Sequence, residues 1–418
     1  MDYFEYQGNQ LFCEKVKVSD LAQEYGTPLY VYSRRTLVEH YRKLADAFKD
    51  LSPLVCYSVK ASSTIALCRA LAQEGAGFDV VSGGEIFRAL QAGVKGDRVV
   101  FAGVGKTRQE MVEALEADIL QFNVESPGEL ELLDEAAHEL RRKARVALRV
   151  NPDVVADTHD YLATGKHGTK FGMTLETAAE CLKTAGRFSS VEVVGLHVHV
   201  GSQITDTAAH VKAVERTSEF LSDAWPPNLP FRTLDIGGGF GIFYKGGEAR
   251  SAEEFGRALS PLIRRLSCRL ILEPGRFIVG NAGILVTRVL YRKESAGQTF
   301  VVCDAGMNDL IRPSLYGAFH RIWPVTTAPG GEGAGGRIRA DIVGPVCESG
   351  DFFARDREIP SVAPGECLAI FSAGAYGMAM SSNYNSRPRA AEILVDGETA
   401  TLVRKRETYK DLVRNEIY

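Results

Sequence analysis

Residues 54–61 read Leu-Val-Cys-Tyr-Ser-Val-Lys-Ala, an apolar run of strand character that stops at Lys60. The small polar residues Ser62, Ser63 and Thr64 follow directly. A lysine that leaves a buried strand loses hydration, which lowers the pKa of its amine and suits that amine to attack a carbonyl carbon. A lysine that reaches from a strand end into solvent is the plainer alternative. The rest of the chain decides between the two.

Strands and helices alternate outward from this run, and the alternation predicts a barrel. Ser33 is placed to cap a helix, and residues 127–139 and 208–222 are amphipathic at helical spacing. Strand–helix units repeated over roughly 240 residues are typical of a TIM-like (β/α)8 barrel. The strands are expected at residues 54–59, 78–81, 99–102, 119–124, 145–150, 191–200, 233–236 and 269–273.

The pattern changes after residue 276, where strands follow one another without long helices. These strands are expected at residues 284–291, 299–303, 340–343, 367–372, 391–395 and 399–403. They predict an all-β domain after the barrel, so the expected fold class is α/β plus all-β. The glycine-rich residues 329–336 are expected to form a flexible insertion.

Composition excludes several classes of protein. The 418 residues carry a net charge of -4, which offers no basic surface to nucleic acid or to an anionic membrane. The 8 cysteines include no Cys-x-x-Cys pair, which argues for a reducing compartment and against a zinc site. The N-terminus does not resemble a signal peptide, and no apolar run reaches ~18 residues. We expect a cytoplasmic protein with no nucleic-acid partner, membrane partner or metal.

Chemistry-bearing residues follow most of the expected barrel strands. In such barrels the active site lies at the carboxyl ends of the strands. The residues at these positions are Lys60, Asp79, Arg149, His197–Gln203, Gly237–Gly241 and Glu273–Arg276. A lysine, a histidine, a glycine-rich turn and a carboxylate are thus predicted to face one mouth.

The turn Gly237-Gly238-Gly239-Phe240-Gly241 lets backbone N–H groups approach an anion such as phosphate. A dinucleotide fingerprint would need glycine at position 242, which is Ile. A plain turn that requires positive φ is the alternative.

His197 and His199 are two apart on a strand and share one face. A hydrolytic metal site needs further ligands, and the other histidines form no partner motif. We therefore favour a planar cofactor stacked on one ring, with the other histidine packed in the strand. Glu273 forms a salt bridge with Arg276 or with a helix in one interpretation, whereas beside a pyridine ring it would keep the ring nitrogen protonated.

The predicted β domain holds a second group of candidates. Cys347 precedes Glu348 in a polar turn, unlike the cysteines in apolar runs, although a small packed side chain is the commoner fate of a free cysteine. Arg312, four residues before Tyr316, suits either a substrate carboxylate or a surface salt bridge. The segment Gly374-Ala-Tyr376-Gly377 is a plain turn in one interpretation, and in another Tyr376 donates to phosphate.

These motifs, taken together, resemble those of the fold type III, alanine racemase-like family of pyridoxal-phosphate-dependent decarboxylases. The resemblance runs in order from about residue 28 to residue 407, and seven motifs in register are far more specific than any one. The motifs are Tyr57-Ser-Val-Lys60-Ala, Gly77-Phe-Asp-Val-Val-Ser-Gly-Gly-Glu85, His197-Val-His-Val-Gly-Ser-Gln203, Gly237-Gly-Gly239, Glu273-Pro-Gly-Arg276, Cys347-Glu-Ser-Gly-Asp351 and Gly374-Ala-Tyr-Gly377.

The resemblance implies that pyridoxal 5′-phosphate is the cofactor and that Lys60 holds it covalently. It also implies that His199 stacks on the ring, that Glu273 pairs with the pyridine nitrogen, and that Asp79 and Arg149 line its surroundings. The phosphate would be held by Ser202, Gly237, Gly238, Gly239, Gly275, Arg276 and Tyr376.

The resemblance further implies that Cys347 donates a proton. The substrate would be bound by Arg276, Arg312, Tyr316, Glu348 and Tyr376. The most similar branch of the family decarboxylates meso-2,6-diaminopimelate to L-lysine and CO2. A barrel of residues 33–276 and a β domain of residues 1–32 and 277–418 would share active sites between two copies in a homodimer.

Other activities remain as alternatives. A decarboxylase of ornithine or arginine would need acidic groups, not Arg312, at the distal end of its substrate. A racemase would have arginine in place of Glu273, and a non-catalytic carrier would need no second domain. One departure stands out: Ser58 and Ser62 occupy positions where the family usually has Ala and Asn. Both are small, so we expect the pocket to survive.

Overall fold

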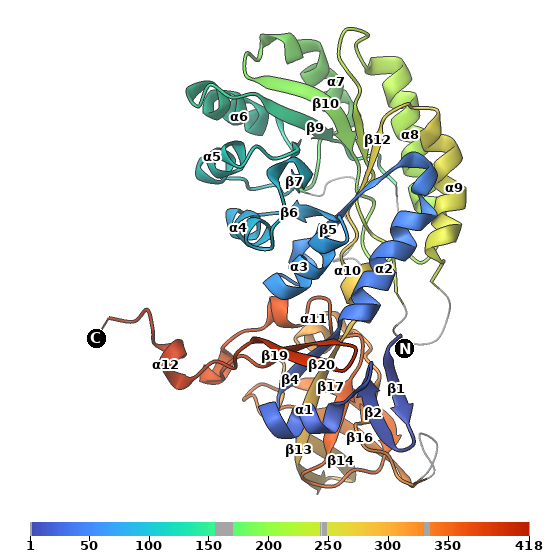
Figure 1. The fold of residues 1–418 in the computed structure, drawn as a ribbon, viewed down its shortest axis with the longest axis vertical. Coiled ribbons are helices and arrows are strands. Elements are labelled where there is room, and N and C mark those ends of the chain that lie inside the picture. The colour runs from blue at the N-terminus through green and yellow to red at the C-terminus, as the bar shows by residue number, and fades with distance from the viewer. Residues whose placement is uncertain (1, 155–169, 243, 245–248, 330–334, 418) are drawn as a thin grey trace. The chain divides into compact units, whose positions relative to one another are not determined.

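The computed structural model describes residues 2–154, 170–242, 244, 249–329 and 335–417, and the chain divides into two compact units (Figure 1). The sheet unit comprises Met1–Glu39, Phe243–Gly247 and Ile278–Tyr418. The barrel unit comprises His40–Ile242 and Glu248–Phe277.

The barrel unit is built around a closed barrel of parallel strands, in the order β10-β11-β12-β5-β6-β7-β8-β9. All the strands expected from the alternating pattern are present, which confirms the (β/α)8 prediction. They are largely buried, as the strands of a barrel covered by helices must be. The strands are β5 (Leu54–Ser58), β6 (Gly77–Val80), β7 (Val99–Phe101), β8 (Gln121–Val124), β9 (Ala144–Arg149), β10 (Val191–His197), β11 (Thr233–Asp235) and β12 (Arg269–Leu272).

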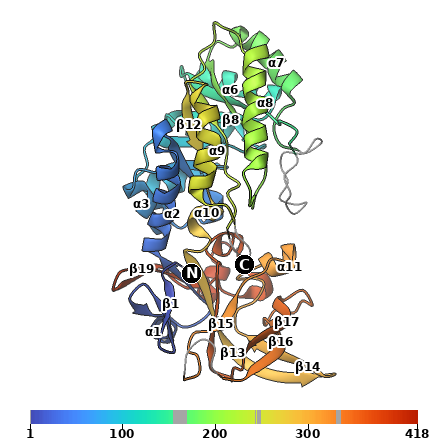
Figure 2. The same cartoon turned by 90° about the vertical axis from the view of Figure 1, so that its right-hand side faces the viewer.

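Helices follow the barrel strands, and several of them begin at side-chain caps. Ser82, Thr107, Ser126 and Ser251 each accept a hydrogen bond from a backbone N–H in the first turn of the next helix. Figure 2 shows α8 and α9 side by side on the outside of the barrel. The helices are α3 (Ile65–Gln73), α4 (Gly83–Gln91), α5 (Arg108–Glu116), α6 (Pro127–Glu139), α7 (Leu175–Thr184), α8 (Ala208–Ala224), α9 (Ala252–Arg264) and α10 (Arg276–Val279).

Helix α2 (Arg34–Ala47) begins after Ser33, as predicted, because Ser33 Oγ accepts from Thr36 N at 3.0 Å. Short 3-10 turns are η1 (Lys49–Leu51), η2 (Val59–Ala61), η3 (Gly96–Arg98), η5 (Ala185–Arg187), η6 (Met378–Met380) and η7 (Tyr384–Ser386).

The sheet unit contains a large mixed sheet and a small antiparallel sheet of β1, β2 and β3. In the large sheet, β4 pairs with β13 and with β19, so an N-terminal strand lies between two strands from late in the chain. Leu21 of α1 and Val31 of β4 pack in one apolar core with Ile284 and Ile393. The elements are β1 (Phe4–Gln7), β2 (Gln10–Cys13), β3 (Val16–Lys17), α1 (Val18–Tyr25), β4 (Leu29–Ser33), β13 (Gly283–Ser295), β14 (Gln298–Cys303), α11 (Arg312–Tyr316), β15 (Ile322–Pro324), β16 (Arg337–Val343), β17 (Phe352–Pro360), β18 (Cys367–Ile370), β19 (Ala391–Asp396), β20 (Thr399–Arg404) and α12 (Tyr409–Leu412).

Three features of the sheet unit differ from or extend the prediction. Strands β15 and β17 were not expected, because β15 has only 3 residues and the sequence of β17, Phe-Phe-Ala-Arg-Asp-Arg-Glu-Ile-Pro, has charged residues at its centre. Strand β17 pairs with β16 at the end of the order of the sheet. Strands β1 to β3 are too short to give a periodic signal. Residues 330–334 of the expected glycine-rich insertion lie outside the described residues.

None of the helices that the structure describes combines the length and apolar character needed to cross a membrane.

Candidate active site

Lys60 lies directly after β5, on the 3-10 turn η2. Its Nζ donates to Asp79 Oδ2, on the neighbouring strand β6, at 2.8 Å. The Asp79 side chain is fully buried, whereas 39% of the Lys60 side chain is exposed. The sequence predicted an amine desolvated by burial. The structure instead places the amine at the end of a strand, half in solvent and paired with a buried carboxylate.

Asp79 is held in place by Ser58 as well as by Lys60. Ser58 Oγ donates to Asp79 Oδ2 at 2.7 Å. Burial and the nearby charge of Glu273 raise the pKa of Asp79, and the contacts with Lys60 and Ser58 oppose that rise. Asp79 Oδ1 has no hydrogen-bond partner among the described residues. The Ser58 hydroxyl therefore acts on the partner of Lys60.

Glu273 follows β12 and points into a polar group of buried side chains. Its Oε1 accepts from Asn123 Nδ2 at 3.1 Å, and its Oε2 lies 3.3 Å from His197 Nε2. Burial by itself raises the pKa of Glu273, but His197, Lys60 and a hydrogen bond with Asp235 outweigh it, so the net pKa lies below the usual range. The barrel therefore keeps a buried carboxylate charged, as a partner for a cationic group.

His199 is held in the neutral form beside the glycine-rich turn. Its Nδ1 accepts from Gly238 N at 3.2 Å. Burial lowers the pKa of His199 well below its usual value, and the charges of Arg149 and Lys60 add to the effect. A neutral imidazole at this position offers a flat face to a planar ring without adding charge.

Arg149 is fixed by a residue that the sequence analysis did not identify, Glu125. Arg149 Nη1 donates to Glu125 Oε1 at 2.5 Å, and both side chains are buried. Glu125 also accepts from the backbone N–H groups of Gly172 at 2.9 Å and Gly103 at 3.2 Å. Its place in the sequence could have indicated this role, because Glu125 directly follows β8 at the same end of the barrel as Lys60.

The glycine-rich turn has two residues in the left-handed region, Gly237 at φ +67 and Gly239 at φ +90. A Cβ atom on Gly239 would lie 2.5 Å from Gly201 O, so only glycine fits there. The segment that holds Gly201 continues to Ser202, whose Oγ accepts from Arg276 Nη2 at 3.2 Å. The structure thus brings the turn, Ser202 and Arg276 together, as the phosphate-binding prediction requires.

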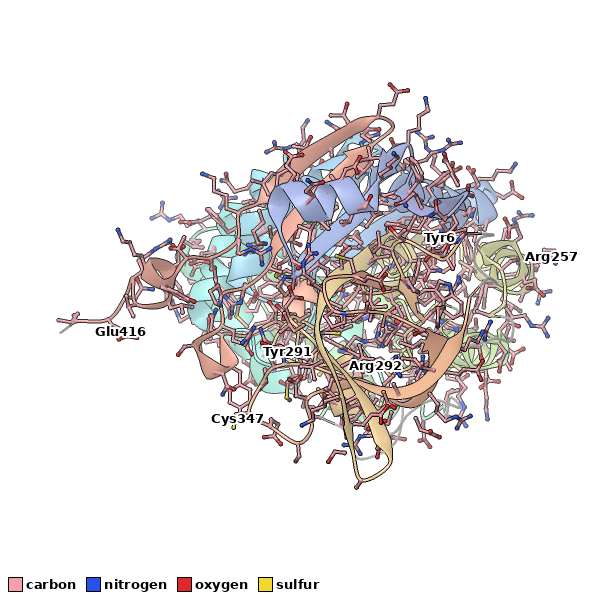
Figure 3. All side chains as sticks on the ribbon, turned by 90° about the horizontal axis from the view of Figure 1, so that it is seen from below. Tyr6, Arg257, Tyr291, Arg292, Cys347 and Glu416 are labelled. Atoms are coloured by element: carbon pink, nitrogen blue, oxygen red, sulfur yellow. The ribbon has the colours of Figure 1, made fainter. Side chains whose placement is uncertain are left out.

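Arg312 and Tyr316 lie on α11 of the sheet unit, close to the turn that carries Cys347. Ser314 Oγ on this helix donates to Gly350 O at 2.5 Å, which ties the two segments together. Cys347 is exposed at the periphery, and its backbone N–H donates to Asn385 Oδ1 at 2.7 Å (Figure 3). The predicted proton donor is therefore accessible.

A buried histidine orients Arg312. His320 Nδ1 lies 2.8 Å from Phe371 O, which makes Nδ1 the protonated nitrogen. Nε2 can then accept from Arg312 Nη1 at 2.9 Å. His320 lies in no recognisable sequence motif, because its partners come from two other segments of the sheet unit.

The remaining candidates of the sheet unit lie in loops. Glu348 Oε1 accepts from Gly350 N at 3.3 Å, within the cysteine turn. Tyr376 has φ +57 and lies in a separate loop, which is joined to the loop before α11 by a hydrogen bond from Ser382 N to Asn308 O at 2.9 Å.

The residues at the barrel mouth fit a carbonyl cofactor that carries a phosphate. The Lys60 amine, at a strand end, is paired with the buried carboxylate of Asp79, whose Oδ1 has no hydrogen-bond partner among the described residues. Glu273 adds a second buried carboxylate, which is charged. The glycine-rich turn lies beside the segment of Ser202, which Arg276 contacts. His197, Asp235 and Glu273 have ligand atoms within 4.8 Å of one another. However, the amide of Asn123 donates to both carboxylates, which is the arrangement of a hydrogen-bonded cluster and not of a cation site.

A closed (β/α)8 barrel with a lysine, a buried carboxylate and a glycine-rich turn at its mouth defines a class of barrel enzymes. Comparison with known proteins shows which family within this class the chain belongs to. The family model described as "Pyridoxal-dependent decarboxylase, pyridoxal binding domain" matches residues 34–280. The diaminopimelate decarboxylase of Aquifex aeolicus is 47% identical over 98% of this chain and 96% of its own. That of Pseudomonas aeruginosa is 46% identical over 100% of this chain and 99% of its own.

Solved structures agree with these sequence relatives. The diaminopimelate decarboxylase of Helicobacter pylori, complexed with L-lysine, has a TM-score of 0.91 and 38% identity, covering 95% of this chain and 98% of that one. The M. jannaschii enzyme in co-complex with L-lysine has a TM-score of 0.93 and 36% identity, covering 100% and 98%. The chain belongs to the pyridoxal-dependent decarboxylases and, within them, to the diaminopimelate decarboxylase family.

Proposed function

We propose that the chain decarboxylates meso-2,6-diaminopimelate to L-lysine and CO2, with pyridoxal 5′-phosphate as its cofactor. The observation that carries the proposal is the Lys60–Asp79 pair at the mouth of the barrel, in a chain 47% identical over 98% of its length to a diaminopimelate decarboxylase. L-Lysine, the expected product, is bound in the solved H. pylori and M. jannaschii relatives.

The barrel unit supplies the cofactor-binding residues in this proposal. When bound, the cofactor supplies an electron sink for the electron pair left behind by CO2. Lys60 would hold it covalently, and Asp79 would keep that amine in position. His199 would cover the ring, Glu273 would face its nitrogen, and Arg149 would lie nearby. The phosphate would be held by Ser202, Gly237, Gly238, Gly239, Gly275 and Arg276, together with Tyr376 of the sheet unit.

The sheet unit supplies the substrate-binding residues and the acid. Arg312, pre-oriented by His320, offers a guanidinium to the distal carboxylate of the substrate, with Arg276 as a second cation. Glu348 faces the distal amine, and Tyr316 and Tyr376 complete the contacts. Cys347 returns a proton to the carbon that loses CO2, because a thiol gives up a proton close to neutral pH. These roles are supported by the connection between α11 and the cysteine turn.

We infer that two copies form a homodimer in which the sheet unit of one completes the site of the other. Phe87 is 62% exposed on α4, and the exposed Val81 and Val104 follow β6 and β7 at the mouth of the barrel. Exposed large apolar side chains at the ends of these neighbouring strands and on α4 support a partner that covers them. Mixing Lys60→Ala with Cys347→Ala subunits tests the inference, because mixed dimers regain one intact site, whereas Lys60→Ala alone is inactive and Cys347→Ala alone is slowed by roughly 10²-fold or more.

A cytoplasmic location is also proposed. All 8 cysteines are free, and most of them are buried, as in proteins of a reducing compartment.

The decisive experiment for the function is product analysis. Purified protein with pyridoxal phosphate is incubated separately with meso-diaminopimelate, ornithine, arginine and lysine, and CO2 and amine products are quantified. We expect CO2 and L-lysine from meso-diaminopimelate alone. Faster release of CO2 from ornithine or arginine would favour the diamine-forming alternative.

A further inference from the structure

Two hydrogen-bonded rungs cross the interior of the barrel between β8 and β11, which are not neighbouring strands. In the first rung Thr233 Oγ1 donates to Gln121 Oε1 at 2.9 Å. In the second rung Asn123 Nδ2 donates to Asp235 Oδ2 at 3.0 Å. Gln121 Nε2 donates to Asn123 Oδ1 at 2.8 Å and joins the rungs. We call these four residues the lumen ladder.

The lumen ladder replaces apolar packing with polar groups. A barrel interior is usually filled by branched apolar side chains, yet Gln121, Asn123, Thr233 and Asp235 are all buried here. Buried amides and carboxyls are costly unless they are hydrogen-bonded. The ladder meets that requirement and runs in one direction, because each donor points toward the carboxylates. The second hydrogen of the Asn123 amide is donated to Glu273 Oε1 at 3.1 Å.

Asp235 and Glu273 lie too close together for both to be charged. Their oxygens, with a ring nitrogen of His197, lie within 4.8 Å of one another. Two buried carboxylates at such separations hold one proton between them. Glu273 has His197 at 3.3 Å, whereas Asp235 receives neutral N–H donors, from Asn123 and from Gly237 at 2.9 Å. The geometry therefore leaves the charge on Glu273 and the proton on Asp235.

The pKa shifts in the cluster agree with this assignment. Burial raises the pKa of Asp235 well above its usual value, and the charge of Glu273 adds to the rise. The pKa of Glu273 is lowered despite burial. Titratable groups that face the pair include Lys60, Asp79, His197 and His199. Cys56 of β5 faces it as well, and the pKa of its thiol is raised by burial and by these carboxylates.

We propose that Asp235 is a positioning residue, which carries a proton and donates it in a hydrogen bond to Glu273, so that the lumen ladder holds Glu273 ionised toward the ring nitrogen of the cofactor. The role of Glu273 at the ring nitrogen rests on the proposed function. The protonated state of Asp235 does not, because it follows from the ladder in the protein itself.

Infrared spectroscopy tests the proton directly. Spectra of wild type and Asp235→Asn are compared at about pH 8.5, where Glu85 and Asp309, with pKa values raised to about 7, are largely ionised. We expect a carboxylic-acid carbonyl band in wild type that is lost in Asp235→Asn, both with and without pyridoxal phosphate. Identical spectra would overturn the proposal, even in a fully active enzyme. Conversely, if the band is present in a protein that decarboxylates none of the substrates, the proposed function fails but the protonated state of Asp235 is supported.

Cofactor binding tests the positioning role. Asp235→Asn keeps an N–H donor to Glu273, so we expect its dissociation constant for pyridoxal phosphate to stay within about threefold of wild type. Asp235→Leu removes the donor. We expect the acid limb of its cofactor-binding pH profile to move upward by roughly one to two units, a tenfold to hundredfold change in proton affinity. Thr217→Val removes a buried hydroxyl of α8, away from the ladder, and serves as the matched control.

Three outcomes would contradict the proposed role of Asp235. An unshifted acid limb in a folded Asp235→Leu protein would show that Glu273 does not depend on Asp235. If Asp235→Leu does not fold, the comparison of wild type with Asp235→Asn still decides, because a tenfold loss of affinity in Asp235→Asn would mean that Asp235 acts as an anion. Stoichiometric metal in purified wild type, absent from Asp235→Asn, would likewise overturn the proposal.

Discussion

Replacing Ser58 with alanine tests whether its hydroxyl stabilises the partner of Lys60. Ser58 Oγ donates to Asp79 Oδ2 at 2.7 Å, and both side chains are buried, so no water replaces the lost donor. A hydrogen bond to a charged group contributes about 1.5–3 kcal/mol, whereas one between neutral groups contributes about 0.5–1.5 kcal/mol. We expect Ser58→Ala to lower the free energy of unfolding of the barrel by about 2 kcal/mol when Asp79 is ionised.

The loss depends on pH, with a defined sign. The pKa of Asp79 is raised in the folded protein, so the folded state binds this proton more tightly and the contribution of Asp79 to stability falls as pH rises through that range. Removing the donor raises the folded pKa further. The difference in stability between wild type and Ser58→Ala should therefore grow with pH, from about 1 kcal/mol with Asp79 protonated to about 2 kcal/mol with it ionised.

Urea unfolding followed by tryptophan fluorescence measures the difference. The chain has 2 tryptophans, Trp225 in the barrel unit and Trp323 in the sheet unit, so a Trp323→Phe background reports on the barrel alone. With a slope of about 3 kcal/mol per M, the midpoint should fall by about 0.7 M at pH 8. Ser62→Ala is the matched control, because the buried Ser62 Oγ has no hydrogen-bond partner among the described residues. Equal midpoints for the two variants, or a pH-independent difference, would show that the Ser58 hydroxyl does not stabilise ionised Asp79.

Three further predictions concern the proposed roles. Cys347→Ala should keep the absorbance of the bound cofactor but slow turnover by roughly 10²-fold or more, and an unchanged rate in steady-state assays would exclude Cys347 as the acid. Arg312→Ala should raise KM for meso-diaminopimelate by about tenfold or more through loss of a charged hydrogen bond, and normal saturation would contradict carboxylate binding. Glu125→Gln should lower the free energy of unfolding by about 3 kcal/mol, because it leaves Arg149 buried without its anion, whereas Glu131→Gln in an exposed pair should change it by less than about 1 kcal/mol; equal urea midpoints would contradict this.

Much of the barrel was predictable because its signals are local. Apolar runs such as residues 54–58 end at polar residues, and hydroxyl caps such as Ser126 begin the helices that follow. The position of Lys60, Asp79 and Glu273 at one mouth followed from the rule that parallel strands present their carboxyl ends together.

The supporting residues were not predictable in the same way. Gln121, Asn123, Thr233 and Asp235 alternate with apolar residues, a pattern that ordinarily indicates a strand with one face in water. Only closure of the barrel turns that face inward and brings β8 opposite β11. The contact between His320 and Arg312 likewise depends on the fold of a loop. Polar residues at period two in strands otherwise expected to be buried were the signal that the sequence offered.

The most direct test of the account is to identify the lysine that holds the cofactor. Purified protein is incubated with pyridoxal phosphate, the carbon–nitrogen linkage is reduced with borohydride, and the labelled peptide is located by mass spectrometry. We predict a single label on Lys60 and none in Lys60→Ala. A protein that takes up no pyridoxal phosphate, or a label on the buried Lys106, would contradict the central claim.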